Sequence, residues 1–177
     1  MIDSKLSMKT HVIKICQTAY FDLKRISSIR RFLTEDATKT LVTSYILSRL
    51  DYCNCFLMGT PNSVIPLQKI QNFAARLVLL APRHHHSTPL LEKNLHWLPI
   101  SERIKYKIAC MCFNAISGSG PAYLSELLHV YTPSRTLRSS SNTRMLEIQQ
   151  CKRKIHGFHT FSVLLWTRHL EFTPTRP

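Results

Sequence analysis

The stretch LQKIQNFAARLVLL, residues 67–80, decides the fold class of this chain. Its apolar residues recur at steps of three and four, which places them on one face of a helix. These apolar residues are Leu67, Ile70, Phe73, Ala74, Leu77 and Val78. The polar residues Gln68, Lys69, Gln71 and Arg76 are expected on the opposite face. The pattern therefore predicts an amphipathic helix with one face to bury.

A second helix is predicted over residues 101–116, and we expect each of the two helices to cover the apolar face of the other. The apolar positions of this second helix are Ile104, Ile108, Met111, Cys112 and Ala115. The connector between the helices carries Pro82, Pro89 and Pro99. Within it, Trp97 is expected to cap the helix pair, and Pro99 to stop any helix that runs through His96.

Two further helices are predicted before this pair. The first begins at Thr10, which can cap it, and continues with apolar spacing to Leu33. The second runs from Thr34 to Leu50, because Thr34 is followed by Glu35 and Asp36, a favourable start. Its expected buried residues are Ala37, Leu41, Tyr45 and Ile46. After the central pair, Gly118 to Pro121 predicts a turn, with Pro121 opening a short helix. Helical spacing outweighs strand alternation throughout, so the predicted fold class is mainly α.

The charge of the chain points to an acidic partner. The chain has 177 residues and a formal net charge of +14, from 24 Lys and Arg against 10 Asp and Glu. Such a balance suits nucleic acid or an acidic membrane face. No signal peptide or membrane-spanning run is visible, because lysines interrupt the N-terminal apolar residues. We therefore expect an intracellular product, cytoplasmic or nuclear, that is neither secreted nor membrane-bound and has six reduced cysteines.

From Tyr131 the sequence is rich in Ser, Thr and Arg and has no sustained period. Residues 131–160 contain six Lys and Arg and only one acid, Glu147, a net charge of +5. Candidate nucleic-acid-binding residues here are Arg135, Arg138, Lys152, Arg153 and Lys154. They could contact phosphates, with an affinity that falls as salt rises. A solvated basic arm without a specific partner remains the alternative.

No pattern in the chain predicts a catalytic or metal centre. The three histidines His84 to His86 are adjacent, so they cannot all face one ion from a helix or strand. Cys53 and Cys55, like Cys110 and Cys112, are separated by a single residue, whereas zinc sites use two to four. There is no adjacent pair of aspartates and no glycine-rich phosphate loop. We expect no metal, no cofactor and no catalytic residue.

Several blocks of this sequence resemble a known family. They are SRLDYCN (48–54), LQKIQNFAARL (67–77), LHWLPI (95–100), PAYLSELL (121–128) and YTPSRTLRSS (131–140). In this order and spacing they are similar to the region that follows the palm in reverse transcriptases of LINE-type, non-LTR retrotransposons of the jockey kind. The residues that the resemblance singles out are Asp51, Tyr52, Gln71, Asn72, Arg76, His96, Trp97, Leu98, Pro99 and Arg103.

The resemblance implies a fragment of an RNA-directed DNA polymerase. Residues 1–9 would be the remnant of the palm-to-thumb junction, residues 10–130 a helical thumb-like bundle, and residues 131–162 an irregular basic arm. The implied partner is RNA or an RNA–DNA hybrid. The family's catalytic aspartates and its endonuclease have no counterpart here, so this chain alone is expected to be inactive.

Residues 163–177 depart from the family pattern, in which a Trp-Asn-Ser-Leu-Pro block follows the Phe-Ser pair. One permissible coding of Leu170 to Arg176 gives this block when it is read one base later. We therefore hypothesise a frameshift between Ser162 and His169. Different codons in the nucleotide sequence would disprove it.

Two main classes of function remain open from the sequence, and a third, a metal-dependent enzyme, ranks last and would require a bound ion in protein purified without added metal. One is a non-catalytic fragment with residual binding of template and primer. The other is a helical protein-interaction module, or an inert translated fragment, which would self-associate through exposed apolar helix faces. Salt-sensitive binding to nucleic acid favours the first, and self-association favours the second.

Overall fold

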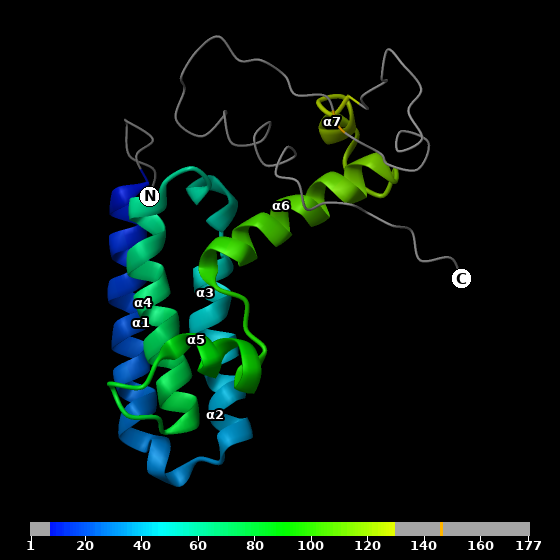
Figure 1. The fold of residues 1–177 in the computed structure, drawn as a ribbon. Coiled ribbons are helices and arrows are strands. Elements are labelled where there is room, and N and C mark those ends of the chain that lie inside the picture. The colour runs from blue at the N-terminus through cyan, green and yellow to red at the C-terminus, as the bar shows by residue number, and fades with distance from the viewer. Residues whose placement is uncertain (1–7, 130–145, 147–177) are drawn as a thin grey trace, which may run out of the picture. The chain divides into compact units, whose positions relative to one another are not determined.

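The computed structural model describes residues 8–129 and Leu146, and Figure 1 shows its ribbon. Over these residues the chain forms helices joined by turns, and none of them forms a β-strand. This confirms the mainly α prediction. The chain divides into two compact units, residues 1–104 and 105–177, and each is described by itself.

The first unit is built from four long helical stretches and their short extensions. Its elements are α1 (Lys9–Ile29), η1 (Arg30–Phe32), α2 (Glu35–Val42), η2 (Thr43–Leu47), α3 (Ser48–Asp51), η3 (Asn54–Leu57), α4 (Pro61–Leu79), α5 (Ser87–Pro89) and η4 (Leu90–Leu95). The segments η1 and η3 are 3₁₀-helical, whereas η2 and η4 are π-helical. The helix α6 (Ile100–Ile116) begins in this unit and continues into the second.

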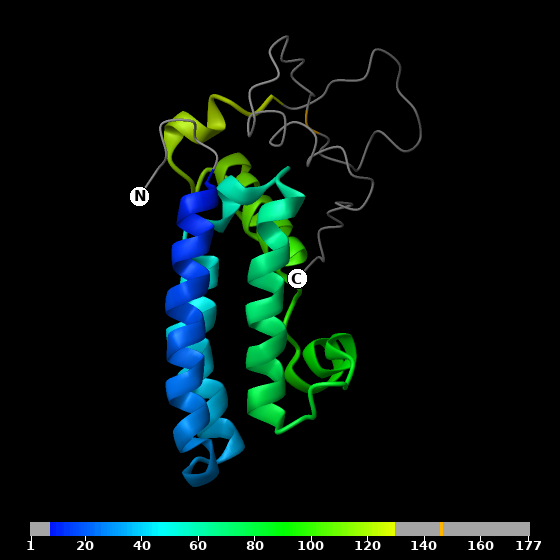
Figure 2. The same cartoon turned by 90° about the vertical axis from the view of Figure 1, so that its left-hand side faces the viewer.

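Three of these stretches form a bundle. α1 and α4 run in the same direction, and the continuous stretch α2–η2–α3 runs beside them in the opposite direction (Figure 1). Figure 2 shows α1 and α4 side by side along their length. α4 packs on α1, on α2 and on η4. This corrects, for α4, the expectation that its main partner is the helix over residues 101–116.

The apolar stripe that the sequence predicts on α4 is largely buried. Leu67 and Ala74 are fully enclosed, and Phe73 is half-buried at the edge of the stripe. The other side chains that close the core of the first unit are Val12, Ala19, Leu23, Ile26, Val42, Ile46, Leu47, Leu50, Leu57, Ile70, Leu77, Val78, Leu90, Leu91, Leu95, Trp97, Ile100 and Ile104. Removing these side chains from water is the main source of stability for the bundle.

The two predicted helix starts have different outcomes. Thr34 caps α2 as predicted, because its Oγ1 accepts a hydrogen bond from the Ala37 backbone amide at 3.3 Å. Thr10 does not cap α1. The helix starts one residue earlier, at Lys9, after Met8 in a left-handed conformation that offers no side-chain cap. The cap prediction for α1 was therefore wrong.

The helical stretch over residues 34–50 buries a different set of side chains from the predicted one. Tyr45 is 54 % exposed, and the buried residues of this stretch are Thr38, Val42, Ile46, Leu47 and Leu50. Thr38 can be buried because its hydroxyl donates to the Thr34 carbonyl oxygen at 2.8 Å. The wider π-helical turn in η2 also changes which residues follow the buried face.

The second unit contains residues 105–116 of α6, a turn, and the short helix α7 (Ala122–Ser125). On α6, Ile108, Cys112 and Ala115 are buried, as the spacing predicts, whereas Met111 is only half-buried. The predicted turn is present, with Gly118 at a φ of 78°. Pro121 lies just before α7 rather than at its first position.

Candidate nucleic-acid interface

The cations predicted to bind nucleic acid lie in the C-terminal arm. Arg135, Arg138, Lys152, Arg153 and Lys154 all fall outside the described residues. The residues singled out by the family resemblance, in contrast, all lie within them, in the first unit. Their contacts decide whether they form a binding surface or hold the fold together.

Polar side chains on α4 form a network that includes Gln71, which is fully buried. The amide nitrogen of Gln71 donates to the Leu98 carbonyl oxygen at 2.8 Å. The amide of Gln68 donates to the side-chain oxygens of Gln71 and Asn72, at 3.0 and 2.8 Å. The expectation that Gln71 faces outward was therefore wrong. A polar residue can occupy this buried position because its hydrogen-bonding groups have partners.

The block from His96 to Pro99 is fixed by this network. The Gln68 side-chain oxygen accepts from the Ile100 backbone amide at 2.9 Å, so α4 binds the chain on both sides of Pro99. His96 adopts a left-handed conformation that ends η4. Trp97 is buried, and its backbone amide donates to Leu91 at 2.8 Å. The backbone contacts of this block position the start of α6, and Trp97 is buried, whereas His96 and Leu98 are exposed.

Asp51 and Arg103 form an ion pair across the first unit. The Arg103 Nε donates to one carboxylate oxygen of Asp51 at 2.8 Å, and a second guanidinium nitrogen donates to the other. The Asn54 amide also donates to Asp51, at 3.2 Å. Both charged side chains are partly exposed, at 33 % for Asp51 and 22 % for Arg103. The forked geometry gives the pair its specificity and joins α3 to α6.

The remaining family positions have separate environments. Arg76 reaches from α4 to the loop that follows it and donates to the His85 carbonyl oxygen at 3.2 and 3.3 Å. Tyr52 is 67 % exposed. Several of the family-like positions therefore hold the fold together, whereas Tyr52, His96 and Leu98 are exposed.

A buried cation that sequence reasoning missed is Arg30, at the end of the first predicted helix. Its three guanidinium nitrogens donate to the carbonyl oxygens of Leu77, Val78 and Leu33, at 3.0, 2.8 and 2.8 Å. Arg30 is only 8 % exposed, whereas the adjacent Arg31 is exposed. Arg30 satisfies the last carbonyls of α4, which helix geometry leaves without partners. It is a structural residue and contributes no surface charge.

The described surface is positively charged because acidic residues are few and some of them are paired. Residues 8–129 contain 15 Lys and Arg and 7 Asp and Glu, a net charge of +8. Of these acids, Asp22 binds Arg49 at 2.6 Å, and Asp51 binds Arg103. Exposed cations on α1 and η1 are Lys9, Lys14, Lys24, Arg25 and Arg31. This helix therefore offers cations that the sequence analysis had not selected as a site.

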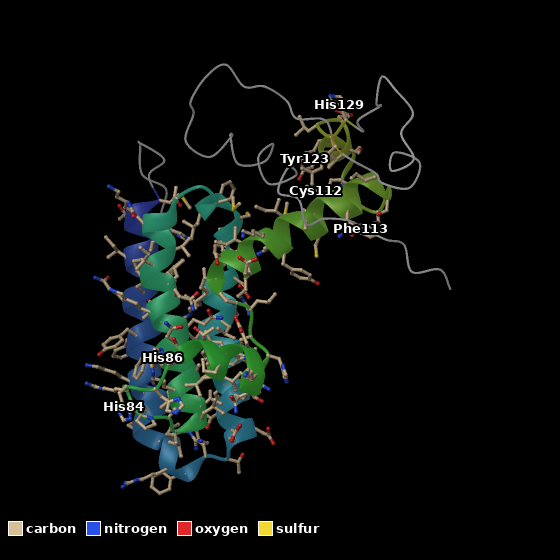
Figure 3. All side chains as sticks on the ribbon, in the orientation of Figure 1. His84, His86, Cys112, Phe113, Tyr123 and His129 are labelled. Carbon is tan, nitrogen blue, oxygen red and sulfur yellow. The ribbon has the colours of Figure 1, made fainter. Side chains whose placement is uncertain are left out.

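No group of three or more His, Cys, Asp or Glu side chains within the described part of the chain could hold a metal ion. His84 and His86 lie on the loop that follows α4 (Figure 3). Burial raises the pKa of the Cys16 and Cys112 thiols, so these thiols are less reactive at neutral pH. The Cys110 thiol, one helical turn from Tyr106, raises the pKa of that phenol through a side-chain hydrogen bond.

Comparisons with protein-family models, with curated proteins and with solved structures find no match for this chain. Among the described residues, no helix combines the length and the apolar character needed to cross a membrane.

Proposed function

We propose that this chain is a non-catalytic, nucleic-acid-binding fragment related to the thumb region of LINE-type reverse transcriptases. The observation that carries the proposal is the distribution of charge on the helical bundle. Asp22 and Asp51 are held in ion pairs, and five cations of α1 and η1 are directed to solvent. The order of the family-like sequence blocks adds the class of partner, RNA or an RNA–DNA hybrid.

The proposal gives the chain no polymerase activity, because its sequence contains no adjacent aspartates that could hold catalytic magnesium ions. Its role would be to hold the sugar–phosphate backbone of a template and primer. Such contacts depend on charge and not on base sequence, so binding should tolerate many sequences.

The C-terminal arm provides the first test. We expect the triple variant Lys152→Gln, Arg153→Gln, Lys154→Gln to bind an RNA–DNA hybrid more weakly, with a salt dependence reduced by about 3 in the log–log slope. The variant makes fewer contacts with phosphates. For each contact that is missing, about one counterion fewer is released from the nucleic acid on binding. Fluorescence anisotropy with a labelled RNA–DNA hybrid, measured over a range of potassium chloride concentrations, gives both quantities.

A second triple variant has the same net charge and serves as the control. Lys39→Gln, Arg83→Gln and Lys93→Gln remove three cations from α2, from the loop after α4 and from η4, and none of the three belongs to α1 or η1. This control should keep more of the salt dependence than the arm variant. Equal losses would show that only total charge matters, and binding by wild-type protein that does not change with salt would contradict the proposal.

A self-associating helical module is the second candidate, and exposed apolar side chains favour it. Phe32 is 75 % exposed, Leu80 69 % and Ile65 52 %. Apolar surface of this kind can mark a protein interface. Sedimentation velocity separates the candidates, since the module should form dimers or larger species and the nucleic-acid-binding fragment should remain monomeric without RNA.

A further inference from the structure

One side of α1 and η1 combines aromatic rings with cations on the surface. We name this surface the basic–aromatic face and define it by Tyr20, Phe21, Lys24, Arg25, Arg31 and Phe32. All six side chains are exposed, and the three rings have exposed fractions of 47 % for Tyr20, 60 % for Phe21 and 75 % for Phe32. The core of the bundle does not need these rings, because α1 fills it with Val12, Ala19, Leu23 and Ile26.

Each ring of the basic–aromatic face is paired with a cation. The Lys24 ammonium lies 5.0 Å from the centre of the Tyr20 ring. The guanidinium carbon of Arg25 lies 5.8 Å from the Phe21 ring, and that of Arg31 lies 4.6 Å from the Phe32 ring. The cation holds each ring in place from one side. The exposed fractions of Phe21 and Phe32 show that much of each ring remains accessible to a ligand.

The charge around these rings has one sign. Residues 9–33 contain six Lys and Arg and a single acid, Asp22, which binds Arg49 at 2.6 Å. Arg30 is buried against α4, so its charge is not presented at the surface. The face therefore attracts a polyanion, and its rings select for a polyanion that carries flat apolar groups.

The face continues onto α4. Tyr20 and Phe73 lie in contact, with ring centres 5.9 Å apart and a tilt of 39° between the rings. Lys69 and Arg76 lie four residues before and three residues after Phe73, so they share its side of α4. The surface thus extends across two parallel helices that are joined by their aromatic contact.

We propose that the basic–aromatic face binds single-stranded nucleic acid by stacking bases on Phe21 and Phe32 while Lys24, Arg25 and Arg31 contact phosphates. The inference rests on the proposed function and names the binding surface and the form of the ligand. Exposed rings flanked by cations are the combination that proteins use for unpaired bases. A duplex keeps its bases stacked on one another, so it offers these rings nothing to bind.

The length of the face fits a short oligonucleotide. Phe21 and Phe32 are separated by roughly 17 Å along the helix, from a rise of about 1.5 Å per residue. A stacked strand with about 3.4 Å per nucleotide covers this distance with about five nucleotides. Oligouridylate of about twelve nucleotides is therefore long enough to span the site with overhangs on both sides.

The test measures binding of labelled oligouridylate to the full chain and to the double variant Phe21→Leu, Phe32→Leu. We expect the variant to bind at least about thirtyfold more weakly, because both stacking surfaces are lost. Its salt dependence should not change, since no charge is removed. The triple variant Lys24→Gln, Arg25→Gln, Arg31→Gln should instead lower the log–log salt slope by about 2.

Phe56→Leu is the matched control, because Phe56 is 65 % exposed in η3 and residues 51–60 contain no Lys or Arg. It should bind like the wild type. A strand of the same length without bases should bind the wild type and the double variant equally. Oligothymidylate should bind within about threefold of oligouridylate, since stacking does not read the 2′-hydroxyl.

The outcomes separate this inference from the proposed function. If the double variant binds oligouridylate like the Phe56→Leu control, or if it loses as much affinity for a duplex as for the single strand, the stacking site is wrong. In that case the proposed function still stands, provided that the arm variant loses salt-dependent binding. If the wild type binds no polynucleotide at low salt, both are wrong. Circular dichroism confirms that each variant remains helical.

Discussion

Replacement of Arg30 by methionine should lower the free energy of unfolding by about 3 kcal/mol or more. The guanidinium makes three hydrogen bonds to backbone carbonyls, two of them at the end of α4. Hydrogen bonds from a charged group contribute about 1.5–3 kcal/mol each, and their loss leaves buried acceptors without partners. Methionine keeps most of the length of the side chain, so the loss of packing is small. The change is large against a total stability of about 5–15 kcal/mol.

The adjacent residue provides the control for Arg30. Arg31→Met removes an exposed cation whose contact is with the Phe32 ring, and it should cost no more than about 1 kcal/mol. Arg30→Lys should fall between the two, because an ammonium cannot match the fork of the guanidinium. Urea unfolding followed by circular dichroism measures all three variants. A loss below 1 kcal/mol for Arg30→Met would show that water replaces the three hydrogen bonds.

Replacement of Gln71 by leucine is the second change with a large expected effect, about 2–3 kcal/mol of destabilisation. Leucine fits the buried position by size, but it cannot donate to the Leu98 carbonyl oxygen. It also removes an acceptor of the Gln68 amide, which keeps Asn72 as a partner. The cost therefore comes mainly from the Leu98 carbonyl group, which loses its partner at a partly buried position.

Hydrogen exchange gives a second measurement for Gln71. The Ile100 backbone amide is held by Gln68, and Gln71 helps to position Gln68. In Gln71→Leu the Ile100 amide should therefore exchange faster than in the wild type. Lys69→Leu changes an exposed residue two positions away and should alter stability by less than about 0.5 kcal/mol. Unchanged exchange at Ile100 in Gln71→Leu would contradict the role given to the network.

The local features of the fold could be predicted from the sequence. Thr34 followed by two acids predicts a helix start, and the structure has one there. The apolar spacing of residues 67–80 and 101–116 predicts two helices whose buried faces are mostly correct. These predictions succeed because capping and amphipathic spacing depend on residues within a few positions of one another.

The buried polar groups could not be predicted in this way. Gln71 and Arg30 have ordinary surface composition, and their partners lie 27 and 47 or 48 residues away in the chain. Helical spacing itself places Gln71 beside the apolar stripe, four residues after Leu67 and three before Ala74, but its polar side chain gave no sign of the buried partner at Leu98. The helical stretch formed by α5 and η4 was also missed, since Pro89 suggested a connector.

The proposed binding face has the positive charge that the sequence analysis looked for, but it lies in another part of the chain. The sequence drew attention to the arm, where basic residues are adjacent in the chain, and those residues lie outside the described ones. The cations of the basic–aromatic face are spread over residues 24–31 and come together with the rings only on a helix. A search for aromatic residues beside Lys or Arg at helical spacing could have found Tyr20 with Lys24 and Phe21 with Arg25.

The π-helical segment η2 determines the directions in which the side chains of α3 point. Successive residues of an α-helix are rotated by about 100°, so a turn that is one residue wider changes the direction of every later side chain. Leu50 and Asp51 come after this turn, and Asp51 faces Arg103. Inserting or deleting one residue within 43–47 would therefore turn Asp51 away from Arg103. The ion pair that would be lost joins residues 52 positions apart in the chain.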